Sequence, residues 1–531
     1  MFLELYTDVE NDMNSWFAPI ASVMVAPAIQ QATIEALPRG PTKAALVKAI
    51  DLAQTSVCAV ARLFAEKYEE EFTPFVETFV SQVWALLTEV SAAEEYDALV
   101  STAISFLSSM SRKEWYKALF ENNLAALCEK IAIPQLQLRE SDEELFEENW
   151  ADYVSRDMLG ADQDTRRRTA ADLVTALCVH FEPQVTEILK QYIAYLLGQA
   201  AASPDNWKAK DVAMYVVLAL TVKSKTRARG AVAINPYVDI GDFFTTSVIP
   251  ELESTDLNEK PIIKADCLKF ITQFRSQLPA EALPTVFALA QKWLACPQPV
   301  VHSYAAIAIE KLLAVKDEAG AVRLPVAAIA DRLGDTLAAL FGALQQRDSG
   351  ENEHVMLAIL RVVSVGKELV FPFASAIIGE VAARLTIVAQ NPRQPKFNHN
   401  LFEVLACLIH YLCKDSPATV DTFVNCFLPI FEVILGTEAC NDLQPYTFQV
   451  LAQLLELSPT VPESFAGIFP SLLLAVMWET QANCPAIARL LAAYLDKGFA
   501  PSADQVRLAN PLPYSGVVLS SYIYILFIVK C

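Results

Sequence analysis

Glycine is scarce in this chain, with 15 glycines in 531 residues, and histidine is scarcer, with five. So little glycine argues against Gly-rich β architectures and against the Gly-rich loops that hold phosphates. The phosphate-loop patterns G-x-x-x-x-G-K-[ST] and G-x-G-x-x-G, the nucleophile pattern G-x-S-x-G and the zinc pattern H-E-x-x-H are all absent. These absences disfavour the enzyme classes that depend on such patterns.

Positive charge is the second shortage. The chain carries 41 Lys and Arg residues against 62 Asp and Glu residues, which gives a formal net charge of −21. A strongly acidic protein repels phosphate groups, so we expect this one to bind no nucleic acid. Two interpretations of the charge stay open here: it favours basic protein partners, or it serves solubility alone.

Paired cysteine patterns and membrane-spanning runs are also missing. The eleven cysteines, from Cys58 to Cys531, form no C-x-x-C pattern, and residues 1–6 place no basic segment before an apolar run. These features predict a reducing compartment. The most apolar run, Val517–Val529, is shorter than the ~20 residues that span a bilayer, so we expect no membrane association.

Apolar residues are plentiful, at 53% of the chain, and they recur at helical spacing in tracts that usually follow a Pro, Asn or Asp. Successive tracts start 38 to 55 residues apart, close to the period of about 40–47 residues of HEAT repeats, which are pairs of helices. The two longest steps imply insertions near residues 221–242 and 316–326. The tracts begin at Asp164, Asn206, Pro261, Pro299, Glu351, Lys396, Asp442 and Asn483.

Further apolar tracts between and before these would be the first helices of the pairs. They begin at Pro74, Tyr96, Pro183, Leu283 and Phe371. One helix pair cannot bury its apolar face alone, whereas stacked pairs build a continuous core. No long tract alternates apolar and polar residues between hairpin turns, as strands would. The sequence therefore predicts an all-α HEAT-repeat solenoid, a superhelical arch of antiparallel helix pairs that serves as a binding scaffold rather than an enzyme.

Three segments interrupt the repeat. Residues 30–45 predict a loop, residues 223–242 predict a long loop with four basic residues, and residues 139–164 are strongly acidic. We divide the chain into N-terminal repeats (1–138), an acidic insertion (139–164), continuing repeats (165–497) and an apolar tail (498–531). The basic residues of the second loop are Lys223, Lys225, Arg227 and Arg229.

The acidic insertion combines charge with aromatic residues. Residues 140–164 hold ten Asp and Glu against one basic residue, and Phe146, Trp150 and Tyr153 are interleaved with them. The spacing of four residues would place Phe146 and Trp150 on one helix face. Such a segment suits a basic protein partner, because carboxylates steer the encounter and aromatic rings anchor it. The alternative is a solvated acidic loop whose aromatic residues pack back onto the solenoid.

Other charged or metal-like groups predict structural roles. Arg166, Arg167 and Arg168 open a repeat helix, and we expect them to pair with acidic residues along the stack or in the insertion. Cys407, His410 and Cys413 lie three residues apart, so at most two of them could ligate one ion, whereas a zinc site needs about four ligands. We expect these three to be core residues. The sequence thus predicts no catalytic residue, no metal and no cofactor.

Long strings carry a more specific signal than the repeat does. They include DVENDMNSW, EKYEEEFTPFVETFVSQVWALL, EEYDALVSTAISFLSS, DEELFEENWADYVSRDMLGADQDTRRRTAADLV, NWKAKDVAMY, PIIKADCLKFI, VVHSYAAIAIEKLL and NPRQPKFNHNLFE. In these strings the chain resembles the CAS-type exportins of the importin-β (karyopherin) superfamily. The resemblance covers roughly residues 5–495.

This resemblance implies a transport receptor. Such exportins bind importin-α together with the GTP form of the small GTPase Ran in the nucleus, and release both in the cytoplasm when GTP is hydrolysed on Ran. We therefore expect importin-α and RanGTP as partners, a monomeric chain, and shuttling between nucleus and cytoplasm with presence at the nuclear envelope. In this family an acidic insertion contacts Ran and cargo and contributes to the closed, cargo-free form. The matching stretch is 140–164, with candidate partner-binding residues Glu143, Glu144, Glu147, Glu148, Trp150, Asp152, Tyr153 and Asp157.

The chain also departs from the family pattern. We expect it to lack the N-terminal repeats, which carry the main Ran-binding surface, and the C-terminal repeats, so that it would be a central fragment. Residues 498–531 match nothing in the family. Repeat rhythm alone would equally fit a generic HEAT-repeat scaffold for protein complex assembly, which is the alternative function. An enzyme would need a pocket with perturbed ionisable groups, for which the sequence offers no starting pattern.

Overall fold

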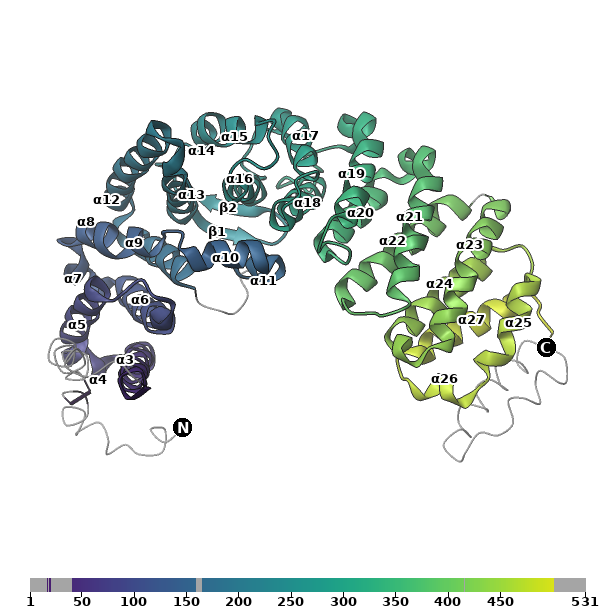
Figure 1. Ribbon diagram of the computed structural model, residues 1–531, viewed down its shortest axis with the longest axis horizontal. Coiled ribbons are helices and arrows are strands. Elements are labelled where there is room, and N and C mark those ends of the chain that lie inside the picture. The colour runs from purple at the N-terminus through teal and green to yellow at the C-terminus, as the bar shows by residue number, and fades with distance from the viewer. Residues whose placement is uncertain (1–16, 18, 21–40, 159–164, 415, 501–531) are drawn as a thin grey trace. The chain divides into compact units, whose positions relative to one another are not determined.

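A computed structural model of the protein describes residues 17, 19–20, 41–158, 165–414 and 416–500, most of which are helical (Figure 1). The chain divides into two compact units, one ending at Pro279 and the other beginning at Ala280. The boundaries expected at residues 138, 164 and 497 follow the repeats and the insertion rather than compact units, and they stay a prediction.

The first unit is a stack of helices with one small hairpin. Helix α6 packs against α3 and α12, and α13 packs against α12 and α16, so neighbouring repeats share one apolar core. Its helices and strands are α3 (Pro41–Lys67), α4 (Glu69–Phe72), α5 (Val76–Glu89), α6 (Asp97–Ser111), α7 (Lys117–Glu121), α8 (Leu124–Leu127), α9 (Ile133–Gln135), α10 (Glu140–Glu148), α11 (Trp150–Asp157), α12 (Arg166–Ala202), α13 (Trp207–Thr221), β1 (Val222–Thr226), β2 (Gly230–Ile234), α14 (Ile240–Phe243), α15 (Ile249–Glu253) and α16 (Pro261–Phe274).

The second unit repeats the helix pair more regularly. Helix α17 packs against α18, α19 against α20, α21 against α22, and α23 against α24. The second helices also contact one another in succession, from α18 through α20, α22 and α24 to α27 (Figure 1). The helices are α17 (Leu283–Trp293), α18 (Pro299–Ala314), α19 (Leu333–Gln345), α20 (Glu353–Gly366), α21 (Ala374–Val388), α22 (Pro395–Cys413), α23 (Pro417–Gly436), α24 (Gln444–Leu457), α25 (Glu463–Leu472), α26 (Ala475–Glu479) and α27 (Asn483–Asp496).

Local sequence explains where many helices begin and bend. Helices α16, α18, α22 and α23 begin with proline, whose missing N–H has no helical partner in the first turn. The longest helix, α12, bends at Phe181 (φ −127°, ψ 28°), two residues before Pro183. The two helices expected from Asp164 and Pro183 are therefore the two limbs of α12. The other tracts expected to be second helices of pairs are confirmed as α13, α16, α18, α20, α22, α24 and α27.

The loop expected over residues 223–242 is wrong. Most of it is a β-hairpin in which β1 pairs antiparallel with β2, from Val222 opposite Ile234 to Thr226 opposite Gly230. Gly230 has φ +74°, and a Cβ there would collide with the Gln273 carbonyl oxygen. Glycine is needed at this position because the backbone is left-handed and a neighbouring helix end lies against it. In VKSKT, the β-branched residues Val222 and Thr226 at its two ends favour a strand.

Two other expected irregular segments are only partly described. The loop expected over 30–45 is wrong for its last residues, because α3 begins at Pro41; residues 30–40 lie outside the described residues. The apolar tail is described only through residue 500, so the run Val517–Val529 also lies outside them.

One described helix, α23, is long and apolar enough to cross a membrane by length and composition alone. Residues Ala418–Gly436 have a mean hydropathy of 1.6. Val420, Phe423, Phe427 and Phe431 are buried at helical spacing, and the helix packs against α21, α22 and α24. A packed core helix meets the same criteria, so this finding is weak evidence for a membrane span.

Candidate functional site

The acidic insertion forms two short helices rather than a loop. Asn149 (φ −136°, ψ 69°) ends α10, and its side-chain oxygen accepts the backbone N–H of Asp152 at 3.2 Å, which caps α11. This break places Phe146 on α10 and Trp150 on α11. The shared helix face expected from their spacing is therefore wrong, because one helix does not continue through Asn149.

The aromatic residues of the insertion face inward. Phe146 is 1% exposed and Tyr153 is 5% exposed, and their rings meet edge to face with centroids 5.1 Å apart. Trp150 is half-buried. Tyr153 is consequently unavailable as a partner anchor in this conformation. Its packing agrees with the alternative in which the aromatic side chains pack back onto the solenoid.

The outer side of the insertion carries unshielded carboxylates. Glu144, Glu147 and Glu148 are exposed, and their spacing of three and four residues places them on one face of α10. We call these three residues the glutamate face. The other two acidic candidates there have partners: Glu143 pairs with Lys208, and Asp152 pairs with Arg156 at 2.6 Å.

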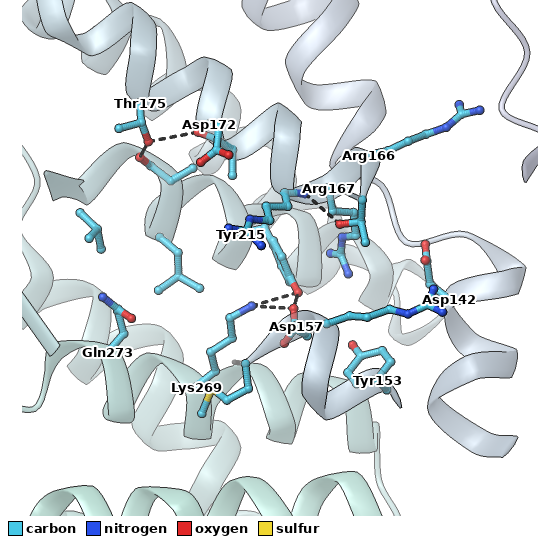
Figure 2. Close-up of a pocket in the computed structure, with 18 of the residues that line it drawn as sticks. Asp142, Tyr153, Asp157, Arg166, Arg167, Asp172, Thr175, Tyr215, Lys269 and Gln273 are labelled. Carbon is cyan, nitrogen blue, oxygen red and sulfur yellow. Dashed lines mark hydrogen bonds and ion pairs between the residues drawn. The ribbon is translucent and has the colours of Figure 1, made fainter. Parts of the chain in front are cut away.

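Asp157 joins the insertion to the repeats. Its carboxylate accepts hydrogen bonds from the Lys269 ammonium at 2.7 Å and from the Tyr215 hydroxyl (Figure 2). Lys269 also donates to the Tyr215 hydroxyl at 3.0 Å. Because Tyr215 belongs to α13 and Lys269 to α16, one carboxylate connects α11 to two successive repeats. Asp157 as a partner contact stays a prediction, and in this conformation it is bonded within the chain.

Arg167 fills the space beneath this junction. Its guanidinium donates to Asp211 at 2.5 Å and to the Leu136 carbonyl oxygen at 3.1 Å. It also lies 3.6 Å from the centroid of the Tyr215 ring, at cation–π distance. Burial lowers the pKa of Arg167, but the negative charge of Asp211 outweighs burial and raises that pKa above its usual range. Arg167 is therefore a permanent buried cation.

Asp97 forms ion pairs with two further arginines beside this network. Its carboxylate accepts from Arg166 Nε at 2.6 Å and from Arg139 Nη1 at 2.7 Å. Arg166 also donates to the Ala93 carbonyl oxygen at 2.7 Å. Together with the Arg167–Asp211 pair, these bonds confirm for Arg166 and Arg167 the pairing expected from the sequence.

A pair of buried aspartates completes the network. Asp211 and Asp266 are buried. Burial raises the pKa of Asp211, against the opposing effect of Arg167; burial and then repulsion from Asp211 raise the pKa of Asp266 well above its usual range. These directions favour a proton on Asp266 and leave Asp211 to neutralise Arg167.

Sequence reasoning missed this aspartate pair. Its signal was a single acid inside an otherwise apolar helical tract, in DVAMYVVLAL for Asp211 and in IIKADCLKFI for Asp266. An acid on the buried face of a helix needs a partner, and here the partner comes from the repeat before it.

A cavity of about 660 Å³ lies between the insertion and the repeats (Figure 2). Its walls come from α10, α11, the N-terminus of α12, α13, β1 and α16. Its lining is rich in charged groups of both signs, which suits charged segments of a protein partner rather than an apolar small molecule. Among the described residues, no group of three or more His, Cys, Asp or Glu side chains could hold a metal ion.

Three buried cysteine thiols of the described chain are poorly suited to act as nucleophiles. All ten cysteines described there are free. Burial raises the pKa of the Cys58, Cys128 and Cys413 thiols to about 12, so they stay protonated at neutral pH. Cys413 is buried and Cys407 half-buried in α22, as expected of core residues, but the expectation is wrong for His410, which is exposed.

Comparison with known proteins places the chain in a family. Residues 11–309 match the family model described as Cse1, and residues 310–512 match the model described as the C-terminus of the CAS/CSE protein. The chain belongs to the CAS/Cse1 family of exportins. The family expected from the sequence strings is thereby confirmed, and the expected HEAT-repeat solenoid is confirmed by the structural likeness given below. The expectation that residues 498–531 match nothing in the family is wrong for residues 498–512, which lie within the second match.

Curated relatives of this CAS-family chain are named Exportin-2. The chain is 41% identical to Exportin-2 of Oreochromis niloticus over 453 residues and 40% identical to that of Homo sapiens over 456 residues. Each alignment covers 85% of this chain and 46% of the relative. The chain thus spans about half the length of the relatives that it matches.

Solved structures agree with this placement. The exportin Cse1 in its cargo-free, cytoplasmic state superposes with a TM-score of 0.77 at 26% identity, over 98% of this chain and 57% of that one. Lph2, a bidirectional nuclear transport receptor of S. cerevisiae, superposes with a TM-score of 0.65 at 12% identity, over 96% of this chain and 56% of that one. The second likeness concerns the fold alone.

Proposed function

We propose that this chain is part of a nuclear export receptor that binds importin-α cooperatively with RanGTP in the nucleus and releases both in the cytoplasm. Membership of the CAS/Cse1 family carries the proposal. The receptor would shuttle between nucleus and cytoplasm and act by binding alone.

We infer that the conformation described here corresponds to a cargo-free form. The likeness to cargo-free Cse1 supports this inference, and so does the inward bonding of Tyr153 and Asp157. For these two residues to meet a partner, α11 would have to leave the repeats. The glutamate face needs no such rearrangement, because its carboxylates are already exposed.

The glutamate face supplies the residues that we propose as first contacts. Exposed carboxylates attract a basic surface at long range and set its orientation. Glu143, Trp150 and Asp152 are half-buried, and they would make contact only after a partner is seated.

A binding experiment tests both the function and the face. Importin-α and Ran locked in its GTP form would be mixed with this chain, and in parallel with a longer chain carrying the N-terminal repeats of a full-length relative. Ternary binding by the longer chain supports the export receptor, whereas failure of both chains leaves only a generic HEAT-repeat scaffold.

The same assay, applied to charge-reversal variants of the longer chain, measures how much the glutamate face contributes to binding. Glu144→Lys, Glu147→Lys and Glu148→Lys together should weaken the ternary complex at least tenfold. The matched control reverses three exposed glutamates elsewhere in the first unit, Glu70, Glu89 and Glu121. Equal binding by both triple variants would contradict the role of the face and leave the receptor function standing.

A further inference from the structure

Three helices at the junction between the insertion and the repeats each carry two polar side chains one helical turn apart. Residues three or four apart lie on one face of a helix, so these side chains form two layers. In the outer layer the Asp157 carboxylate accepts from Lys269 and Tyr215 (Figure 2). The other three residues form the inner layer. The pairs are Tyr153 and Asp157 on α11, Asp211 and Tyr215 on α13, and Asp266 and Lys269 on α16.

The inner layer is the more deeply buried of the two. Asp211 and Asp266 are at most 1% exposed, whereas the Asp157 side chain is 13% exposed. Tyr153 and Lys269 line the cavity between the insertion and the repeats, but neither Asp211 nor Asp266 does. The aspartate pair therefore lies behind the side chains that meet the cavity.

The aspartate pair has one more carboxyl group than it has counter-charges. Among the described residues, Arg167 is the one cation that forms an ion pair with either aspartate, through Asp211. The Lys269 ammonium is bonded to Asp157 in the outer layer. Asp266 Oδ2 and Asp211 Oδ1 have no hydrogen-bond partner among the described residues. A second buried carboxylate without a counter-charge is costly, so the pair should hold a proton.

The charged groups around Asp266 agree with this expectation. They are Asp211 on α13, Arg167 on α12, Asp157 on α11 and Lys269 on its own helix, α16. After burial, repulsion from Asp211 is the largest cause that raises the pKa of Asp266, and Arg167 and Lys269 oppose it. The inner layer therefore favours a neutral Asp266.

Helix α11 covers the aspartate pair with Tyr153. The Tyr153 ring is 5% exposed and packs edge to face on Phe146 of α10. Burial, and then the negative charges of Asp157 and Asp266, raise the pKa of the Tyr153 hydroxyl, which shows that Asp266 lies near it. Movement of α11 away from the repeats would remove this cover and admit water to the pair.

The insertion is linked to the repeats mainly through side chains. The helix in closest backbone contact with α11 is α10, which belongs to the same insertion. Its links to the repeats include the bonds of Asp157 to Lys269 and Tyr215 and the ion pair of Glu143 with Lys208. A segment held in this way can open locally while the repeats stay folded.

We propose that docking of α11 on the repeats takes up one proton, which Asp266 holds while α11 is docked. When α11 leaves, water solvates both carboxylates and the proton dissociates. Because the docked state binds the proton more tightly, docking is strongest below the ordinary aspartate pKa of about 3.9 and weakens as pH rises toward the raised pKa of Asp266. This inference does not depend on the proposed export function.

Native-state hydrogen exchange of the full chain between pH 5.5 and 8 measures how often α11 opens. Division of each rate by that of an unstructured peptide at the same pH gives the equilibrium constant for opening. This constant should rise at least tenfold over the range, and by at most tenfold per pH unit, because one proton is linked. Amides of α6 report opening of the whole unit and should open much less often than those of α11.

Three substitutions assign the proton. Asp266→Asn resembles the protonated side chain, so opening of α11 should change less than twofold across the pH range. Asp211→Asn leaves one carboxylate for Arg167, so it should also remove the pH dependence, and it keeps the test informative if Asp266→Asn does not fold. The matched control, Asp172→Asn, removes an exposed carboxyl group that lines the same cavity and should keep the wild-type dependence.

Several outcomes would overturn the proposal. They are an opening constant of wild-type α11 that changes less than twofold between pH 5.5 and 8, equal pH dependence of Asp266→Asn and Asp172→Asn, and equal opening of α11 and α6 at every pH. Neither Ran nor importin-α is present, so the result is separate from that of the export assay.

Discussion

Two buried polar networks, one in each unit, differ in charge. In the first unit Arg167, Asp211 and Asp266 are buried, and the network contains a permanent cation and a carboxyl with a strongly raised pKa. In the second unit the network contains only neutral groups, centred on His302 and Asn352.

The neutral network connects α18 to α20. His302 Nδ1 donates to the Cys296 carbonyl oxygen at 2.9 Å, and in the neutral ring Nε2 accepts from the Ser349 hydroxyl at 2.6 Å. Asn352 donates to the Ser303 hydroxyl at 2.7 Å, while its oxygen caps α20 by accepting the backbone N–H of His354 at 3.1 Å. Burial lowers the pKa of His302, which keeps the ring neutral near pH 7.

The comparison shows where the chain concentrates charge. The neutral network joins α18 to α20 by hydrogen bonds whose removal has modest effects. The charged network lies where the insertion docks, and each of its charges depends on its counter-charge. Buried charge also occurs elsewhere, as in the pair of Glu310 with Arg361 at 3.0 Å between α18 and α20. A charged junction is a better candidate for rearrangement, because exposed ions can regain water or a partner's charge when they separate.

The largest loss of stability is expected from a substitution in the charged network. Arg167→Met would leave Asp211 buried without its counter-charge, and we expect a loss of about 3–5 kcal/mol in the stability of the first unit. Urea unfolding followed by hydrogen exchange in α12 and α13 would measure it. The double variant Arg167→Met with Asp211→Asn should recover part of the loss; if it is no better than the single variant, the lost charge pairing is not the cause.

A substitution in the neutral network should reduce stability less than one in the charged network. Asn352→Ala removes the cap of α20 and the bond to Ser303, and we expect a loss of about 2 kcal/mol, measured by hydrogen exchange in α18 and α20. Asn352→Ser keeps a capping oxygen and loses the amide donor without adding a charge, so it should fall between the wild type and the alanine variant. A loss for Asn352→Ala as large as that for Arg167→Met would erase the distinction between the networks.

The smallest expected effect is a difference between the two units in how their stability changes with pH. Asp266 has a raised pKa, so its contribution to stability is full below its ordinary pKa of about 3.9 and declines as pH rises through the raised value. His302 has a lowered pKa, so its contribution is full above about pH 6.5 and declines as pH falls through the lowered value. The two slopes should therefore have opposite signs.

Urea midpoints between pH 4 and 8, resolved for each unit by hydrogen exchange, would measure these slopes. Asp266→Asn should flatten the pH dependence of the first unit, and His302→Gln that of the second. Slopes of equal sign in the two units, or variants that leave them unchanged, would show that other groups control the pH response.

Helical periodicity predicted most second helices within a few residues, because it reflects which side chains a helix buries. It failed at the hairpin of residues 222–234, where two short strands rest on the end of α16 through contacts such as the Gln277 bond to the Ala231 carbonyl oxygen at 3.0 Å. Short strands without a long alternating pattern take their conformation from what they pack against.

The sequence by itself determined that this chain is a helical solenoid of the CAS/Cse1 family with an acidic, aromatic insertion, because repeat period, composition and long strings are properties of the chain alone. Only the tertiary structure decided that Tyr153 and Asp157 face the repeats while the glutamate face meets solvent. It also decided that Arg167 pairs with Asp211 in the protein interior. Burial and pairing depend on residues up to 112 positions apart, as between Asp157 and Lys269, and such distances leave no local pattern to read.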